Sequence, residues 1–192
     1  AQRWGPVVRP SSIAEPMRDR PRPFLLRAGP RALRHVLDRG LAPGDVERIP
    51  AAAGGPKGLA LLPIDRLLLQ HGWLPEERPV ELIGASVGAW RMAALAQENP
   101  LAALDRVQHA YVHEQSYSAR PTPPEVSTVC RRIAIAARGN GDMRWRPGVT
   151  LSIVTARARG PLRGRESKLA FGRAVLSNAV ARSRLAGYLE RV

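Results

Sequence analysis

A short apolar run that leads directly into a helical segment constrains the fold of this chain more than any other feature. Residues 80–84 have the composition of a strand that is buried in a parallel sheet, and residues 86–97 continue as a helix. A strand candidate at 46–53 and a helix candidate at 59–73 precede them. This order of strand, helix, strand and helix predicts an α/β domain: a layered sheet with right-handed crossovers and helices on both faces.

The remaining segments extend this pattern. We expect further helices at 30–40, 100–115, 125–137 and 168–184, and a strand at 149–157. Residues 1–23 differ, because they contain five prolines and several arginines without a sustained hydrophobic period. Proline removes backbone donors and restricts the residue before it, so we expect an extended arm there. The α/β domain is then expected over residues 24–192.

The composition excludes several classes of protein. The chain of 192 residues has no apolar run that approaches the about 20 residues of a membrane-spanning helix. Its single cysteine, Cys130, excludes an intrachain disulfide and a zinc site built from cysteines. No segment with the basic, apolar and small-residue parts of a secretory signal opens the sequence. We therefore expect a folded cytoplasmic protein that can associate peripherally with a membrane.

The net charge of +14 raises the question of nucleic acid. Lysine and arginine total 30 against 16 acidic residues, and 28 of the 30 are arginine. A basic excess attracts phosphate. These arginines are scattered, however, and aromatic residues make up only 5% of the chain, too few for base-stacking platforms. A coding bias toward arginine, alanine, proline and glycine accounts for the charge, and we do not expect nucleic acid as a partner.

The segment Gly84-Ala85-Ser86-Val87-Gly88 has the pattern Gly-x-Ser-x-Gly between the strand candidate and the helix candidate. A serine in this context sits on a sharp strand-to-helix turn that only small flanking residues permit, with its hydroxyl pushed into the open. The helix N-terminus adds free N–H groups and positive potential beside it. We predict Ser86 as a nucleophile, with helix capping by its side chain as the structural alternative.

A second glycine-rich segment, at 53–58, also follows a strand candidate and precedes a helix candidate. Consecutive glycines let backbone N–H groups converge on an anion. A serine that transfers acyl groups needs such donors for the oxyanion of its tetrahedral intermediate, and loss of one costs about 2.7–4 kcal/mol. We expect the donors to be Gly54 and Gly55, joined by the N–H of Val87.

A phosphate-binding loop is the alternative for this segment, and the order of its residues excludes it. The Walker pattern requires glycine, then lysine, then serine or threonine. Here Lys57 comes before Gly58, and a leucine follows.

Together the two motifs resemble the patatin-like phospholipase family. That family has a Gly-Gly-Gly-x-Arg/Lys-Gly loop followed by a Gly-x-Ser-x-Gly elbow, and Lys57, Gly58, Gly84 and Gly88 match its pattern, whereas Ala53 replaces the first glycine. The resemblance covers residues 46–95. It implies a patatin-like α/β fold and a serine–aspartate dyad that hydrolyses acyl esters of lipids. We expect no cofactor and no metal.

The aspartate of the dyad is harder to assign. The family carries it in an Asp-Gly pair downstream of the serine, whereas the aspartates that follow Ser86 here, Asp105 and Asp142, lack the glycine. We expect Asp105 on a solvated helix face, so Asp142, in a loop, is the candidate within the chain. The resemblance more strongly implies a catalytic aspartate beyond Val192. The domain would then be incomplete at its C-terminus and completed by a further segment or a second chain.

The histidines do not form a recognisable catalytic or metal-binding pattern. His35 and His71 precede the serine, whereas α/β-hydrolases place their histidine after it. His109 and His113 lie one helical turn apart but lack the glutamate of His-Glu-x-x-His.

These patterns favour a serine acyl hydrolase that acts on lipid esters, with an anionic membrane surface as a candidate partner. Two alternatives stay open. An acyltransferase has the same elbow but lacks the early glycine loop, and a catalytically inactive relative would be a basic module that binds lipid or nucleic acid.

Overall fold

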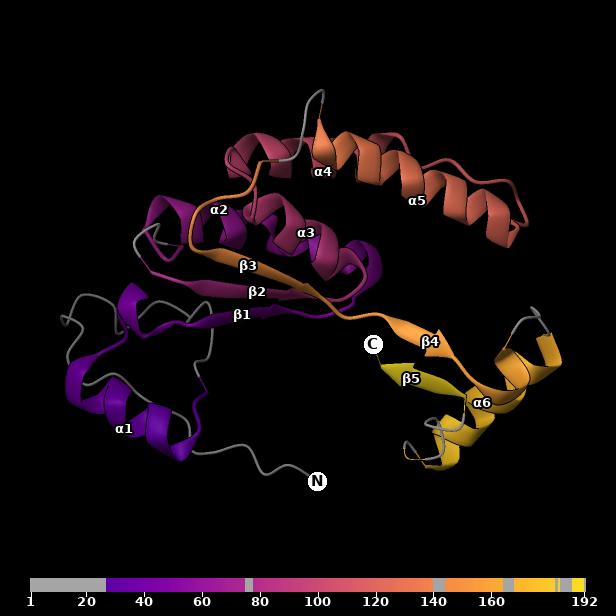
Figure 1. Ribbon diagram of the computed structural model, residues 1–192, viewed down its shortest axis with the longest axis horizontal. Coiled ribbons are helices and arrows are strands. Elements are labelled where there is room, and N and C mark those ends of the chain that lie inside the picture. Colours follow the sequence, from indigo (N-terminus) through magenta and orange to yellow (C-terminus); the bar gives the residue numbers. More distant parts are fainter. Residues whose placement is uncertain are drawn as a thin grey trace, which may run out of the picture. The chain divides into compact units, whose positions relative to one another are not determined.

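The structure is a computed structural model that describes residues 27–74, 78–139, 144–163, 168–181, 183 and 188–191. The chain divides into two compact units, Ala1–Asp45 and Val46–Val192. Figure 1 shows the helices and strands of both units. Among the described residues, no helix has the length and apolar character needed to cross a membrane.

Residues 27–45 of the first unit, which the structure describes, contain the α-helix α1 at Pro30–Arg39. Proline at its first turn fits a position where the missing N–H costs nothing. The helix ends at Gly40, whose φ of 78° is accessible to glycine and whose N–H donates to Val36 O over 3.0 Å. The sequence predicted both ends of this helix, and the structure confirms them.

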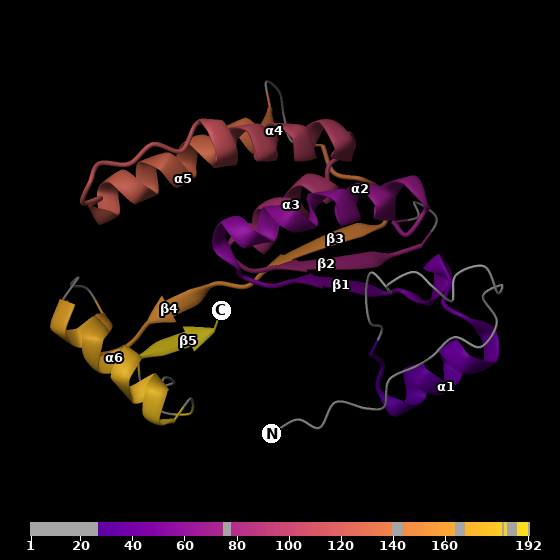
Figure 2. The ribbon, with the colours of Figure 1, turned by 180° about the vertical axis from the view of Figure 1, so that it is seen from behind.

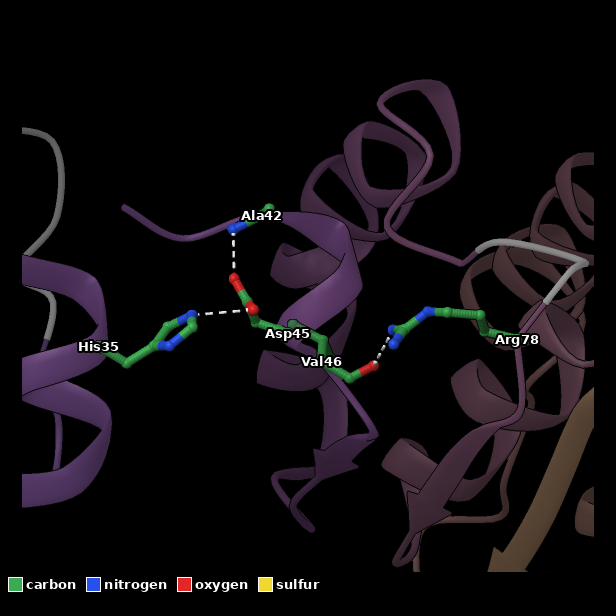
Figure 3. Close-up of polar contacts among 5 residues, drawn as sticks. All are labelled: His35, Ala42, Asp45, Val46 and Arg78. Atoms are coloured by element: carbon green, nitrogen blue, oxygen red, sulfur yellow. Dashed lines mark hydrogen bonds and ion pairs between the residues drawn. The ribbon is translucent and has the colours of Figure 1, made fainter. Parts of the chain in front are cut away.

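Asp45 connects α1 to the turn that follows it. This turn is a 3₁₀ helix, η2, at Pro43–Asp45. The Asp45 carboxylate accepts the N–H of Ala42 at 2.8 Å and lies 2.9 Å from His35 Nε2 on α1 (Figure 3). The Asp45 side chain therefore links α1 to the segment that follows it and to η2.

The second unit is built on a parallel sheet of three strands in the order β1-β2-β3. The strands are β1 at Arg48–Ala51, β2 at Val80–Gly84 and β3 at Val149–Ile153. Ala51 pairs with Gly84, and Gly84 pairs with Ile153, so the carboxyl ends of the three strands are level. At the opposite end, Arg78 donates to the backbone oxygen of Val46, 3.4 Å away (Figure 3).

Helices form two layers above this sheet. They are η3 at Gly55–Leu61, α2 at Leu62–Gln70, α3 at Val87–Leu95, α4 at Pro100–His113 and α5 at Pro123–Arg138. Figures 1 and 2, seen from opposite sides, both show α2 and α3 along one face of the sheet. The helices α4 and α5 pack on α3 and on each other.

The prediction of helices on both faces is not met in the described part of this unit, where α2–α5 all lie to one side of the sheet. The strand order explains the difference. Strands added one after another in the same direction, each by a right-handed crossover, place every connecting helix on the same face.

The core fills the space between the sheet, α3 and α4. Its large side chains that are almost fully buried are Val80, Leu82, Met92, Leu95, Leu104 and Val107. A second cluster of Ala110, Val129 and Ile133 joins α4 to α5. The helix α5 begins with a capping box, in which Thr122 and Glu125 bond each other's backbone N–H.

The other face of the sheet carries a polar row across all three strands. Glu81 on β2 accepts from Arg48 Nε on β1 and from Ser152 Oγ on β3, both at 2.8 Å. The Ser152 hydroxyl first, and then Arg48, lower the pKa of the Glu81 carboxyl, because both stabilise its charged form. Glu81 is half-buried, whereas its neighbours Val80 and Leu82 are buried under the helices. The face of the sheet that carries Glu81 is therefore more polar than the helix-covered face.

Beyond β3 the chain forms a small antiparallel pair and a final helix. The elements are β4 at Ala156–Ala158, η4 at Gly160–Leu162, α6 at Lys168–Val180 and β5 at Leu189–Arg191. The sequence predicted one strand at 149–157, whereas the structure has two separate strands, because β3 pairs with β2 and β4 pairs with β5. The predicted helix at 168–184 is confirmed as far as Val180.

Candidate functional site

Ser86 occupies a strained turn between β2 and α3. Its φ of 54° and ψ of −127° make it the only described residue other than glycine with a positive φ. Such a conformation costs a side-chain-bearing residue about 1–3 kcal/mol and persists only where the surroundings impose it. The strain at this position is the geometry that the sequence predicted for a nucleophile elbow.

The two glycines that flank Ser86 are sterically required. A Cβ on Gly84 would lie 2.4 Å from the Cα of Ala89, and one on Gly88 would lie 2.3 Å from the backbone oxygen of Ala51. Both contacts are with backbone atoms, which cannot move aside as a side chain can. The glycines therefore let the start of α3 pack directly on the ends of β1 and β2.

The Ser86 side chain is exposed and makes no capping hydrogen bond to α3. Backbone atoms close the turn instead: the N–H of Gly88 donates to Ala85 O at 3.0 Å, and the N–H of Ala89 donates to Ser86 O at 2.9 Å. The structural alternative, in which the serine serves as a helix cap, is thus not what the structure has. The hydroxyl is left available at the surface.

The glycine loop leaves the sheet beside this elbow. Because Ala51 and Gly84 are paired in the sheet, the loop after β1 and the turn after β2 begin side by side. Gly55, at φ 55°, opens η3, and Val87 opens α3. The first N–H groups of a helix have no partner within it, so the N–H groups of Gly55 and Val87 have no intrahelical acceptor.

Contact between the loop and the elbow is direct at Gly58. A Cβ there would lie 2.4 Å from Cγ1 of Val87, the residue after the serine. Gly54, before η3, is exposed, as is Lys57 on η3. The structure therefore brings together the predicted residues of the loop and the elbow.

This contact predicts an energetic coupling between Gly58 and Val87. We expect Gly58→Ala to destabilise the fold by about 1–3 kcal/mol through overpacking. Val87→Ala creates the missing room, so the double variant should lose less than the sum of the single variants, by about 0.5–3 kcal/mol. Urea unfolding of the four proteins measures this difference.

Gly88→Ala, alone and with Val87→Ala, is the matched control, because its Cβ meets backbone atoms that Val87→Ala does not remove. Strict additivity between Gly58→Ala and Val87→Ala would contradict the packing described here.

A buried ion pair anchors the helix that starts at Ser86. Arg91 on α3 donates through Nε and Nη2 to the two carboxylate oxygens of Asp65 on α2, both at 2.6 Å. The Asp65 side chain is 1% exposed and that of Arg91 is 7% exposed. The two-point geometry matches the planar guanidinium fork, and it holds α3 against α2 in one orientation. The sequence does not predict this pair, because its only sign there is the presence of charged residues within two largely apolar helices.

Removal of one partner should be costly, because it leaves the other charge buried alone. We expect Asp65→Ala to lower the free energy of unfolding by about 3–5 kcal/mol, and the apolar pair Asp65→Leu with Arg91→Met to recover most of it. Urea denaturation is the measurement.

Arg66→Ala is the control, because the neighbouring pair of Arg66 with Asp105 is exposed and should contribute about 1 kcal/mol or less. An Asp65→Ala protein as stable as Arg66→Ala would contradict the role given to the buried pair.

The base that would activate Ser86 is not located by the described residues. Asp142 lies outside them. Asp105 is exposed, as expected, and accepts from Arg66 Nη2 at 2.6 Å. Within the described ranges, no carboxylate or imidazole hydrogen-bonds to the Ser86 hydroxyl.

The histidine pair on α4 is at the surface. The rings of His109 and His113 are tilted by 40° to each other with their centroids 5.0 Å apart, and His109 Nε2 lies 3.7 Å from a carboxylate oxygen of Glu114. In the part of the chain that the structure describes, no cluster of three or more potential metal ligands occurs. An open groove of about 440 Å³ beside His109 lies between α4 and α5, and none of its lining residues belongs to the elbow or the glycine loop.

Comparisons with protein-family models, with curated proteins and with solved structures found no match to this chain. Function is therefore inferred from the geometry of the site. An exposed, unbonded hydroxyl on a strained turn, next to free backbone N–H groups, is suited to nucleophilic attack on a carbonyl with stabilisation of the resulting oxyanion.

Proposed function

We propose that the chain is a serine acyl hydrolase that acts on lipid esters, as the resemblance to patatin-like phospholipases implies. The observation that carries this proposal is the backbone of Ser86. A φ of 54° is imposed on a non-glycine residue by two glycines that have no room for a Cβ, and the hydroxyl that results is exposed and makes no capping bond. A merely structural serine would not need this strain.

In this mechanism the Ser86 hydroxyl oxygen attacks the ester carbonyl carbon while a base takes its proton. The N–H groups of Gly54, Gly55 and Val87 stabilise the oxyanion of the tetrahedral intermediate. The carbon–oxygen bond to the alcohol then breaks, and the alcohol leaves with the proton. Water hydrolyses the acyl-enzyme in a second step and regenerates the serine.

An aspartate is the proposed base, as in the family that the motifs resemble. Asp142 is the candidate within the chain. The other proposed source is a segment beyond residue 192 or a second chain. A carboxylate that acts on serine without a histidine is effective only where desolvation raises its pKa, so the completed site is expected to be apolar.

Apolar side chains at the end of β3 support an acyl substrate. The N–H of Val154 donates to Gly84 O at 2.8 Å, which places this residue beside the elbow. Val154 is 40% exposed and its neighbour Ile153 is 50% exposed. An acyl chain that covered these side chains would remove their apolar surface from water, which favours binding.

The activity test compares Ser86→Ala with a matched control, Ser127→Ala on the exposed surface of α5. We expect the wild-type chain to hydrolyse 4-nitrophenyl esters, with kcat/KM rising with acyl length. Ser86→Ala should lower kcat/KM by at least about a thousandfold, and Ser127→Ala should leave it unchanged. Release of 4-nitrophenol measures the rate.

Hydrolysis that survives Ser86→Ala would overturn the assignment of the nucleophile. If the folded chain hydrolyses no ester, either alone or together with the segment or second chain proposed to supply the base, the proposed activity is wrong and the binding-module alternative is favoured.

A further inference from the structure

The helix α6 exposes a row of large apolar side chains. Leu169 is 83% exposed, Leu176 67%, Val180 65% and Val175 57%. With 3.6 residues per turn, these four positions fall within one face of the helix. The opposite face carries Ala170 and Ala174, which are 8% and 3% exposed.

This arrangement reverses the usual one, in which large apolar residues face the protein and small or polar residues face water. The aliphatic side chains of α6 lie in water, although its alanines are buried. A contiguous exposed apolar surface of this kind marks a place where another surface docks. We call the row formed by Leu169, Val175, Leu176 and Val180 the α6 stripe.

The segment around the α6 stripe is also the most basic part of the chain. Residues 157–184 contain eight lysines and arginines and one glutamate, so their net charge of 8 − 1 = +7 is half of the chain's +14. Arg157 Nη1 lies 4.0 Å from Glu190 Oε2, and Arg159 Nε donates a 2.8 Å hydrogen bond to the same oxygen. Arg163 and Arg173 are exposed and form no ion pair with any described residue.

We propose that α6 docks on an anionic lipid surface. The α6 stripe would enter the boundary between headgroups and acyl chains, with the helix parallel to the membrane. Arg173, at the border of the stripe, and Arg163, before the helix, would contact lipid phosphates. Each cation near an anionic leaflet strengthens binding by roughly fivefold.

The combination of the two features favours lipid over other partners. A nucleic acid would use the charges but leave the aliphatic row in water. A protein partner would need an apolar patch surrounded by acidic groups that match this cluster of arginines. An anionic bilayer satisfies both. Docking of α6 on a membrane rests on the proposed hydrolysis for its purpose, because the membrane is the surface where the protein would encounter lipid esters.

Vesicle binding tests this inference separately from activity. The whole chain with Ser86→Ala, which prevents turnover, is mixed with vesicles of pure phosphatidylcholine or of equal parts phosphatidylcholine and phosphatidylglycerol. Bound protein is measured by co-sedimentation. We expect binding to the anionic vesicles only, weakening as salt is raised.

Two pairs of variants assign the binding to α6. Leu169→Gln with Leu176→Gln should weaken it at least tenfold, whereas Ile135→Gln on α5, where the side chain is 59% exposed, should have no effect. Arg163→Gln with Arg173→Gln should weaken it about tenfold or more, whereas Arg131→Gln with Arg132→Gln on the exposed surface of α5 should weaken it much less. Circular dichroism checks that each protein is folded.

Several outcomes would overturn the proposal. One is equal binding of the protein to neutral and anionic vesicles. Another is a loss of vesicle binding in the α5 control variants that equals the loss in the α6 variants. Binding to an RNA or DNA oligonucleotide without binding to vesicles would assign the basic segment to nucleic acid. Self-association that Leu169→Gln with Leu176→Gln abolishes, without vesicle binding, would assign the stripe to a second copy. None of these results depends on whether Ser86 hydrolyses esters.

Discussion

The close approach of α3 to the ends of β1 and β2 is the constraint on which the site depends. Backbone atoms lie 2.3 to 2.4 Å from where a Cβ of Gly84 or Gly88 would be, so only glycine fits. This packing makes the turn from β2 into α3 so tight that Ser86 takes a positive φ. The same approach brings Val87 onto Gly58, which joins the elbow to the glycine loop. The strain at Ser86, its exposure and the position of the Val87 N–H beside the glycine loop thus follow from one steric condition.

The stability of this arrangement depends on interactions away from the serine. A strained residue persists only where its surroundings hold it, and α3 is held by the core below it and by the Asp65–Arg91 pair beside it. A buried ion pair is a poor source of net stability, but it has one geometry. An apolar contact at the same place would tolerate small rotations of α3, which would also move the turn at Ser86.

Local patterns carried the predictions that the structure confirms. The strand at 80–84 has the predicted bounds, and the elbow and the glycine loop lie together as expected, because glycine spacing and apolar runs act over a few residues. Features that depend on distant partners were not predicted. The Asp65–Arg91 pair joins two different helices. The break between β3 and β4 arises because β3 pairs with β2 and β4 pairs with β5. The position of α2–α5 on one face of the sheet follows from the order of the strands. The catalytic base stays a prediction, since Asp142 lies outside the described residues.

The most direct test of the account is covalent labelling with a fluorophosphonate, which reacts with activated serine hydroxyls and releases fluoride. Tandem mass spectrometry of the labelled, folded chain identifies the modified residue. We expect a single adduct on Ser86 that disappears when the protein is unfolded before labelling. If Ser86 stays unmodified in the folded protein even when the segment or second chain proposed to supply the base is present, or if other serines are labelled to the same extent, Ser86 is not an activated nucleophile.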